Sequence, residues 1–160
     1  MVELRAAVEA EFERVGDLCV AAYAPFLSLA GHYTAVLRDV ATRAAGAELL
    51  VAADAGELLG TVTFVPHGGL LSEIATPEET EFRMLAVDPA AQGRGVGTAL
   101  MRYIVDASRA LGRERMVCSS QPSMRAAHRV YERLGFTRLP ERDWSPVPGV
   151  ELQAFALSLH

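Results

Sequence analysis

Lysine is absent from this 160-residue sequence, in which all 15 basic residues are arginine. The protein therefore cannot form a lysine Schiff base, and it cannot supply the lysine that a Walker-type phosphate loop requires. Cysteine is scarce as well: Cys19 and Cys118 are too few for a disulfide framework, and their apolar neighbours indicate small buried side chains. These absences exclude two enzyme classes and a disulfide-stapled fold.

Long apolar runs are also missing, since none approaches the ~20 residues that a membrane-spanning helix needs. The start, MVELRAAV, lacks a basic segment followed by an apolar stretch, so we expect no secretory signal and a cytoplasmic location. The net charge of −5 argues against nucleic acid or an anionic membrane as partner, because both bind clustered cations. The charge fits a cationic substrate, or it only keeps a small protein soluble.

What is present is typical of a globular protein, with 51% hydrophobic and 22% charged residues. The periodicity predicts strands over residues 2–8, 48–54, 57–65, 82–87 and 116–120, around Phe136 and over 152–159. It predicts helices over residues 9–22, 33–45, 96–111 and 122–134, and loops over 70–80 and 140–149. We therefore expect one mixed α/β (α+β) domain over residues 1–160, with about six to seven strands and about four helices.

The segment EFRMLAVDPAAQGRGVGTALM leads from a predicted strand through three glycines into a predicted helix. It does not fit the dinucleotide fingerprint, which would need glycine where Thr98 or Leu100 stands. The remaining pattern is Gln92-x-x-Gly95-x-Gly97. Glycines here let successive N–H groups point into one concavity at the positive end of the helix, which suits a pyrophosphate. The alternative is a tight turn whose glycines serve packing alone.

These residues resemble a known family. AVDPAAQGRGVGTALM resembles the acetyl-CoA-binding segment of GNAT-type N-acetyltransferases, whose signature is Q/R-x-x-G-x-G/A. Ala127-x-x-x-Tyr131-Glu132-x-x-Gly135-Phe136 resembles the helix-to-strand segment that follows it in the family. The element order is similar over nearly the whole chain. The resemblance implies a mixed, mostly antiparallel sheet, acetyl-CoA as cofactor, and family dimers that allow a homodimer.

The resemblance also implies a cofactor site. The pyrophosphate loop would consist of Gln92, Gly93, Arg94, Gly95, Val96, Gly97 and Thr98. In the family the preceding strand splays from its neighbour, so backbone groups of Leu85, Ala86 and Val87 would meet the thioester and the pantetheine arm. The Leu85 N–H would stabilise the oxyanion, a contact worth about 3 kcal/mol. Where the family often has Asn, this sequence has Met124, so a polar contact is lost and Met124 would pack against apolar parts of the cofactor.

Two side chains are candidates for proton transfer. Glu81 is the candidate base, and period-2 alternation would place it on one strand face with Arg83, Leu85 and Val87. It is otherwise a surface residue or the partner of an arginine. Tyr131 is the candidate acid for the departing thiolate, because a phenol of pKa ~10 is protonated at neutral pH. It is otherwise a core tyrosine.

The family's acceptor site would lie between the first two helices and the loops before the fourth and last strands. These regions contain the aromatic residues Tyr23, Phe26, Tyr33 and Trp144, interleaved with Glu73, Glu78, Glu79 and Asp143. They suit a small-molecule amine, and ion pairing and cation–π contact would favour a cationic one. The alternative is that Glu73, Glu78 and Glu79 only form a solvated, mobile acidic loop. We expect direct transfer in a ternary complex, since neither motif contains cysteine. The alternatives are a protein N-terminal acetyltransferase and a non-catalytic acyl-CoA sensor.

The four histidines share no metal-ligand spacing, and we expect His128 to be a surface or core residue.

Overall fold

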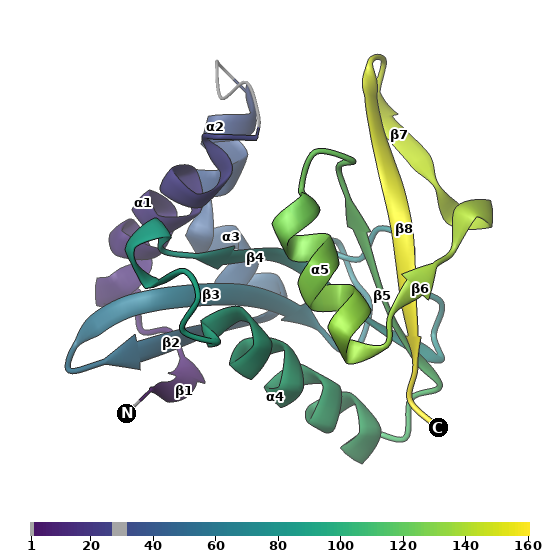
Figure 1. Cartoon of the computed structure of the whole chain (residues 1–160), viewed down its shortest axis with the longest axis horizontal. Helices are drawn as coiled ribbons and strands as arrows, with labels where there is room; N and C mark the ends of the chain where they lie inside the picture. Colours follow the sequence, from purple (N-terminus) through teal and green to yellow (C-terminus); the bar gives the residue numbers. More distant parts are fainter. Residues whose placement is uncertain (1, 27–31) are drawn as a thin grey trace.

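The computed structural model describes residues 2–26 and 32–160. One eight-stranded sheet has the order β1-β2-β3-β4-β5-β8-β6, and β7 pairs with β8 (Figure 1). The strands are β1 (Glu3–Ala6), β2 (Glu48–Asp54), β3 (Glu57–Val65), β4 (Glu79–Val87), β5 (Arg115–Ser120), β6 (Thr137–Arg138), β7 (Trp144–Val147) and β8 (Val150–Ser158). The helices are α1 (Phe12–Tyr23), α2 (His32–Arg38), α3 (Val40–Gly46), α4 (Val96–Ala110) and α5 (Arg125–Leu134), with short 3₁₀ helices at Glu9–Glu11, Pro89–Ala91 and Pro140–Arg142.

The expected mixed, mostly antiparallel α/β fold is confirmed, with eight strands instead of six or seven. Among the described pairs only β4–β5 is parallel. The extra strand is β7, which lies where a loop was predicted over residues 140–149. Its Pro146 suits an edge strand, because a proline without an N–H cannot serve a central ladder. Within the described ranges, no helix has both the length and the apolar character that crossing a membrane requires.

Two helix predictions were wrong in detail. The helix expected over 33–45 is divided at Asp39, whose backbone is not helical. The Asp39 carboxylate caps α3 by accepting a hydrogen bond from the Thr42 N–H at 3.4 Å. The helix expected from Pro122 begins three residues later, at Arg125, with Met124 as its N-cap. The turn before α5 is therefore longer than expected.

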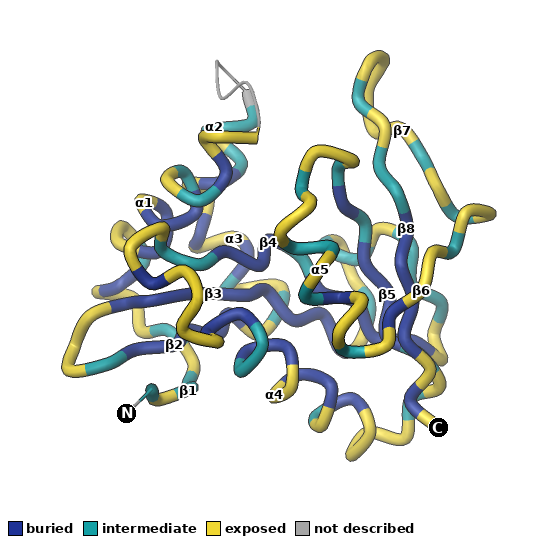
Figure 2. Tube along the Cα trace, in the orientation of Figure 1, coloured by how far each residue is buried: buried dark blue, intermediate teal, exposed yellow. Residues whose placement is uncertain are grey.

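The core lies on both faces of the sheet, which explains the nearly continuous apolar run of β2. Leu50 and Ala52 belong to one buried cluster with residues of α4, whereas Leu49 and Val51 belong to a second cluster with residues of α1. Figure 2 shows the central strands as the most continuously buried part of the chain. Helices α4 and α5 thus cover one face, and α1 to α3 cover the other.

Strand β4 contains an irregularity that positions the site. Its pairing with β3 shifts register between Thr61 and Thr63, and Met84 has a φ of 53°. Two residues of β4, Met84 and Leu85, therefore stand opposite Val62, as in a β-bulge. The bulge interrupts the alternation: Leu85 belongs to the α4-side cluster, while Met84 belongs to the α1-side cluster.

Candidate active site

Strands β4 and β5 pair only at their first residues. The register runs from Glu79 opposite Arg115 to Glu81 opposite Val117, and then stops. Strand β4 continues to Val87, while β5 continues to Ser120 along β8. The two strands diverge from that point (Figure 1), so their facing backbone edges are available to something other than each other.

The glycine turn follows β4. Gly93 and Gly95 have φ values of 81° and 76°, and a Cβ at either position would meet nothing within 4 Å. Gly95 is the N-cap of the 15-residue helix α4, and no side chain caps this end. Uncapped N–H groups at a helix N-terminus, beside glycines that face open space, form an anion cradle. This geometry can accommodate a pyrophosphate, and binding of one by this loop stays a prediction.

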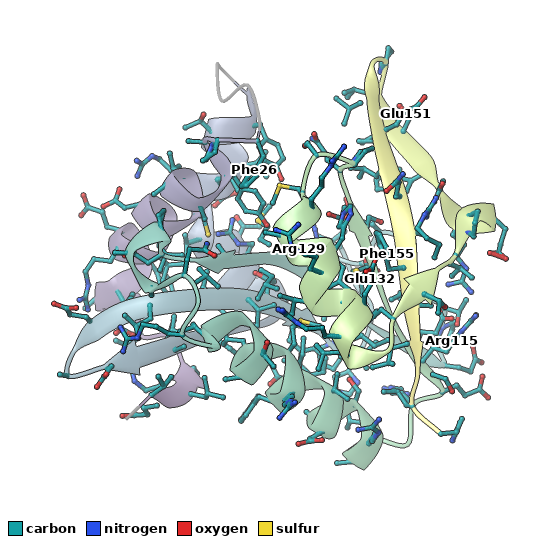
Figure 3. All side chains as sticks on the ribbon, viewed as in Figure 1. Phe26, Arg115, Arg129, Glu132, Glu151 and Phe155 are labelled. Atoms are coloured by element: carbon teal, nitrogen blue, oxygen red, sulfur yellow. The ribbon has the colours of Figure 1, made fainter. Side chains whose placement is uncertain are left out.

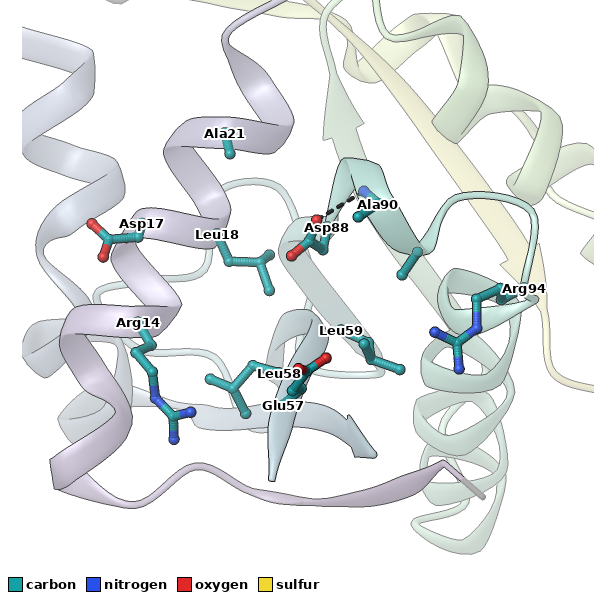
Figure 4. Close-up of a pocket in the computed structure, with 11 residues that line it drawn as sticks. Arg14, Asp17, Leu18, Ala21, Glu57, Leu58, Leu59, Asp88, Ala90 and Arg94 are labelled. Atoms are coloured by element: carbon teal, nitrogen blue, oxygen red, sulfur yellow. Dashed lines mark hydrogen bonds between the residues drawn. The ribbon is translucent and has the colours of Figure 1, made fainter. Parts of the chain in front are cut away.

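Arg94 points away from the turn toward the β2–β3 hairpin. Its guanidinium lies 3.4 Å from the Asp54 carboxylate and is half exposed. Figure 4 shows Arg94 at one side of an open pocket of about 580 Å³, with Arg14 and Asp17 of α1 at the other. The turn residue Asp88 lines this pocket too, and its carboxylate accepts a hydrogen bond from the Ala90 N–H at 2.8 Å. A phosphate contact for Arg94 stays a prediction.

Leu85 lies where β4 has lost regular partners on both sides. It has no one-to-one partner on β3, and pairing with β5 has already ended at Glu81. The Tyr23 hydroxyl of α1 donates a hydrogen bond of 3.0 Å to the Leu85 carbonyl. Helix α1 thereby holds the Leu85 peptide in place. Tyr23 is buried, so it supports the strand, and its predicted contact with an acceptor stays untested.

Tyr131 lies in an aromatic cluster. Its ring centroid is 5.5 Å from those of Phe82 and Phe155 and 5.7 Å from that of Phe136. Burial raises the pKa of Tyr131 well above its ordinary value, so the phenol is protonated at neutral pH. The core position that the sequence offered as an alternative is therefore real, and it is compatible with the acid role, which stays a prediction.

Apart from a catalytic base, the sequence allowed Glu81 to be a surface residue or the partner of an arginine, and the structure shows neither. Glu81 is fully buried, so it is not a surface residue, and it does not pair with Arg83. Its carboxylate accepts hydrogen bonds from the Ser72 hydroxyl and from three successive backbone N–H groups, those of residues 73, 74 and 75, at 3.0–3.1 Å. The expected shared face with Leu85 and Val87 was also wrong, because the bulge at Met84 moves them to the α4 side. Glu81 anchors the loop after β3.

A second carboxylate lies nearer to solvent. Glu73 forms an ion pair of 3.3 Å with Arg83, and its side chain is 23% exposed. Burial raises the pKa of Glu73, an effect that Arg83 opposes and Glu81 reinforces. Tyr33 is close enough to Glu73 and Arg83 for their charges to affect its pKa, which burial raises. The sequence placed Glu73 and Tyr33 either in an acceptor site or, for Glu73, in a mobile acidic loop, and it did not predict that the two group with Arg83.

The remaining predicted acceptor residues lie around the opened strands. The Phe26 side chain is 39% exposed, and its carbonyl accepts a hydrogen bond from the Ser123 hydroxyl, so the end of α1 meets the turn before α5 (Figure 3). The indole N–H of Trp144 donates to the Ser119 hydroxyl at 3.0 Å. Met124 is partly buried and packs with the α1-side cluster. Met124 therefore bridges toward α1, and its contact with a cofactor stays a prediction.

Ser120 and His128 form a contact that the sequence did not predict. The His128 Nε2 atom lies 3.0 Å from the Ser120 hydroxyl at the end of β5. His128 lies three residues before Tyr131. This helical spacing puts His128 and Tyr131 on one face of α5, and it could have identified His128 as a neighbour of the candidate acid. In the part of the chain that the structure describes, no cluster of three or more His, Cys, Asp or Glu residues is arranged to hold a metal ion.

Comparisons with known proteins identify the family of this chain. The model of the acetyltransferase (GNAT) family matches residues 12–136. An uncharacterized N-acetyltransferase of Schizosaccharomyces pombe is 31% identical over 111 residues, which cover 69% of this chain and 64% of that protein. The chain thus spans less than two thirds of this relative's length.

Solved structures share the fold. A GNAT-family acetyltransferase of Staphylococcus aureus Mu50 superposes with a TM-score of 0.78 at 11% identity, over 100% of both chains. The structure of yncA of Salmonella typhimurium with its cofactor acetyl-CoA superposes with a TM-score of 0.69 at 22% identity, over 100% of this chain and 95% of that one. The resemblance of the two sequence motifs is thereby confirmed, and this chain belongs to the acetyltransferase (GNAT) family.

Proposed function

We propose that this protein transfers the acetyl group of acetyl-CoA to a primary amine of a small molecule, within a ternary complex. The observation that carries the proposal is the behaviour of β4, which leaves β5 after Glu81 and runs on to an uncapped glycine turn at the start of α4. An opened strand edge that ends at an anion cradle can hold an extended chain with a pyrophosphate at one end.

The chain's own residues divide the work. The backbone of Leu85 to Val87 would bind the extended arm, and the N–H groups around Gly95 and Gly97 would bind the pyrophosphate. Bound acetyl-CoA supplies the thioester, with an electrophilic carbonyl carbon and a thiolate leaving group. The Leu85 N–H would stabilise negative charge on the carbonyl oxygen, and Tyr131 would protonate the leaving sulfur.

Direct transfer is supported by the state of the two cysteines. Both are free and buried. Burial raises the pKa of Cys19 to about 11 and the pKa of Cys118 well above its ordinary value, so neither thiol ionises at neutral pH. Because the thiolate is the nucleophilic form, an acetyl-cysteine intermediate has no candidate here.

The acceptor amine needs a proton acceptor, and two carboxylates compete for that role. Glu81 is fully buried and accepts hydrogen bonds from four donors of the loop, so it would have to release one of them to take a proton. Glu73 is partly exposed and lies beside Arg83 and Tyr33. This group offers charge and aromatic surface to a cationic amine.

The test is release of free thiol from acetyl-CoA against a panel of polyamines, aminoglycosides, amino acids and short peptides. We expect amine-dependent release with at least one small molecule. Release with peptides alone would favour a protein N-terminal acetyltransferase. Silence across the panel, with acetyl-CoA still raising the melting temperature, would instead indicate an acyl-CoA sensor.

A further inference from the structure

Two side chains, those of Ser120 and His128, connect the buried Tyr131 phenol with the surface of α5. The His128 Nε2 atom lies 3.0 Å from the Ser120 hydroxyl, and the Ser120 side chain is close enough to the Tyr131 phenol to oppose the rise in pKa that burial causes there. The rings of His128 and Tyr131 lie 6.0 Å apart, centroid to centroid. Tyr131 is only 5% exposed and Ser120 only 8%, whereas His128 is half-buried. The three groups therefore run from the interior toward solvent.

Tyr131 has a problem that such a connection solves. If it gives its proton to a leaving thiolate, it becomes a phenolate in an environment where burial strongly disfavours the charged form. Little of the residue meets solvent, so direct reprotonation by bulk water is hindered. A chain of hydroxyl and imidazole groups can move protons between solvent and a buried acid without moving the acid itself.

We propose that His128 and Ser120 form a proton relay that reprotonates Tyr131 from the solvent side of α5. The relay rests on the proposed acetyl transfer, in which Tyr131 is the acid. His128 and Ser120 act through Tyr131, so they are positioning and relay residues.

The protons balance in one sequence of transfers. Tyr131 gives its phenolic proton to the leaving thiolate. The Ser120 O–H proton passes to the Tyr131 oxygen, and the Nε2–H proton of protonated His128 passes to the Ser120 oxygen. His128 is left as neutral imidazole and takes a new proton from solvent water. The net change is one proton moved from solvent to the sulfur.

The surroundings of His128 allow both of its protonation states. Burial lowers its pKa and the charge of Arg138 on β6 lowers it further, while Glu132 on α5 and a backbone hydrogen bond with Gln121 raise it. Glu132 is exposed and projects from α5 one turn after His128 (Figure 3). Its carboxylate can stabilise the imidazolium while the proton arrives. Neutral His128 is then the resting form, and it takes up the solvent proton before it passes one to Ser120.

The first test needs neither cofactor nor acceptor. Nitrogen-15 NMR of the histidine-labelled protein would follow the His128 signals through pH, with His128→Gln for assignment. We expect a pKa below the ordinary 6.5, and a change in the Nε2 shift in both Ser120→Ala and Tyr131→Phe. An Nε2 chemical shift that stays the same in both variants would overturn the proposed link from His128 through Ser120 to Tyr131.

The second test is kinetic. His128→Gln keeps a hydrogen-bonding side chain but cannot carry the proton, and Ser120→Ala breaks the chain; for each we expect kcat to fall by about 10-fold or more, with the KM for acetyl-CoA unchanged. Ser120→Thr, which keeps the hydroxyl, should restore most of the rate. Arg129→Gln, at an exposed position of the same helix, is the matched control and should retain the wild-type rate.

A double-mutant cycle separates the relay from the reaction that it serves. In a Tyr131→Phe background, His128→Gln should cause no further loss of kcat, because no phenolate remains to reprotonate. An unchanged kcat in Tyr131→Phe alone would remove Tyr131 from the acid role and so defeat the proposed mechanism. A full loss in Tyr131→Phe with an unchanged rate in His128→Gln and Ser120→Ala would overturn the relay only.

Discussion

The two ends of β4 behave in opposite ways. At its start, Glu79 to Glu81 pair with β5, and both glutamates are buried with carboxylates that accept hydrogen bonds. At its end, Phe82 to Val87 have no β5 partner, the ladder to β3 shifts at Met84, and the chain passes into a bare glycine turn. One strand thus contains a tied end and an open end.

The tied end makes the open end possible. Arg142 donates two hydrogen bonds to the Glu79 carboxylate, Arg115 lies 2.7 Å from it, and the Thr76 N–H donates to it at 2.9 Å. Glu81 gathers the loop after β3 in the same way. Because these contacts of the two buried glutamates fix β4 against β5 and its neighbouring loops, the strands can diverge beyond them without the sheet coming apart. Rigidity at one end supports backbone exposure at the other.

The largest effect is expected at the open end. Gly95→Val would place a side chain in the cradle, where we expect the affinity for coenzyme A to fall by about 100-fold through loss of charged hydrogen bonds worth about 1.5–3 kcal/mol each. Isothermal titration calorimetry would measure it. The matched control is Gly56→Val, because Gly56 has a similar φ of 84° and open space but lies in the β2–β3 turn. Equal affinity in the two variants would contradict the cradle.

The next effect is at the tied end. Glu79→Gln should lower the free energy of unfolding by about 2–3 kcal/mol at pH 7, because two arginines lose their charged partner. Burial opposes ionisation of Glu79, but hydrogen bonds from Arg142 and the Thr76 N–H outweigh it and lower the pKa below 4.5. A lowered pKa means that the stabilisation is complete above 4.5 and is lost as the pH falls through the folded-state value.

Urea denaturation from pH 7 to pH 3 would check both parts. The difference in the free energy of unfolding between wild type and Glu79→Gln should be largest at pH 7 and should disappear in acid. Glu78→Gln, at the exposed neighbouring position, should behave as wild type throughout. A difference that does not change with pH would show that the ionised carboxylate is not what ties the strands.

The smallest effect concerns Glu81. Because its carboxylate holds the loop, we expect Glu81→Gln to cost about 1–2 kcal/mol of stability and to speed hydrogen exchange at the Ile74 and Ala75 amides, with turnover falling less than about threefold. Glu73→Gln is the comparison, since it leaves the hydrogen bonds from the Ile74 and Ala75 amides to Glu81 intact. If turnover instead fell by about two orders of magnitude while amide protection stayed the same, Glu81 would be established as the base.

The sequence by itself determined the local parts of the protein. The β2–β3 hairpin follows from the Ala55-Gly56 turn, where both residues have positive φ, and the helix after the glycines follows from its apolar spacing. The cradle could be predicted for the same reason, because glycine conformation and helix polarity act within a few residues of each other.

Only the tertiary structure decided the rest. Nothing near Met84 in the sequence predicts the bulge, and the end of β4–β5 pairing depends on two strands that are separated along the chain by the whole of α4. The burial of Glu81 follows from a loop that folds back onto it, and the contact of Ser120 with His128 requires α5 to lie over β5. A side chain's accessibility and hydrogen-bond partners are set by non-local packing, so residue type and spacing could nominate these groups but could not assign their roles.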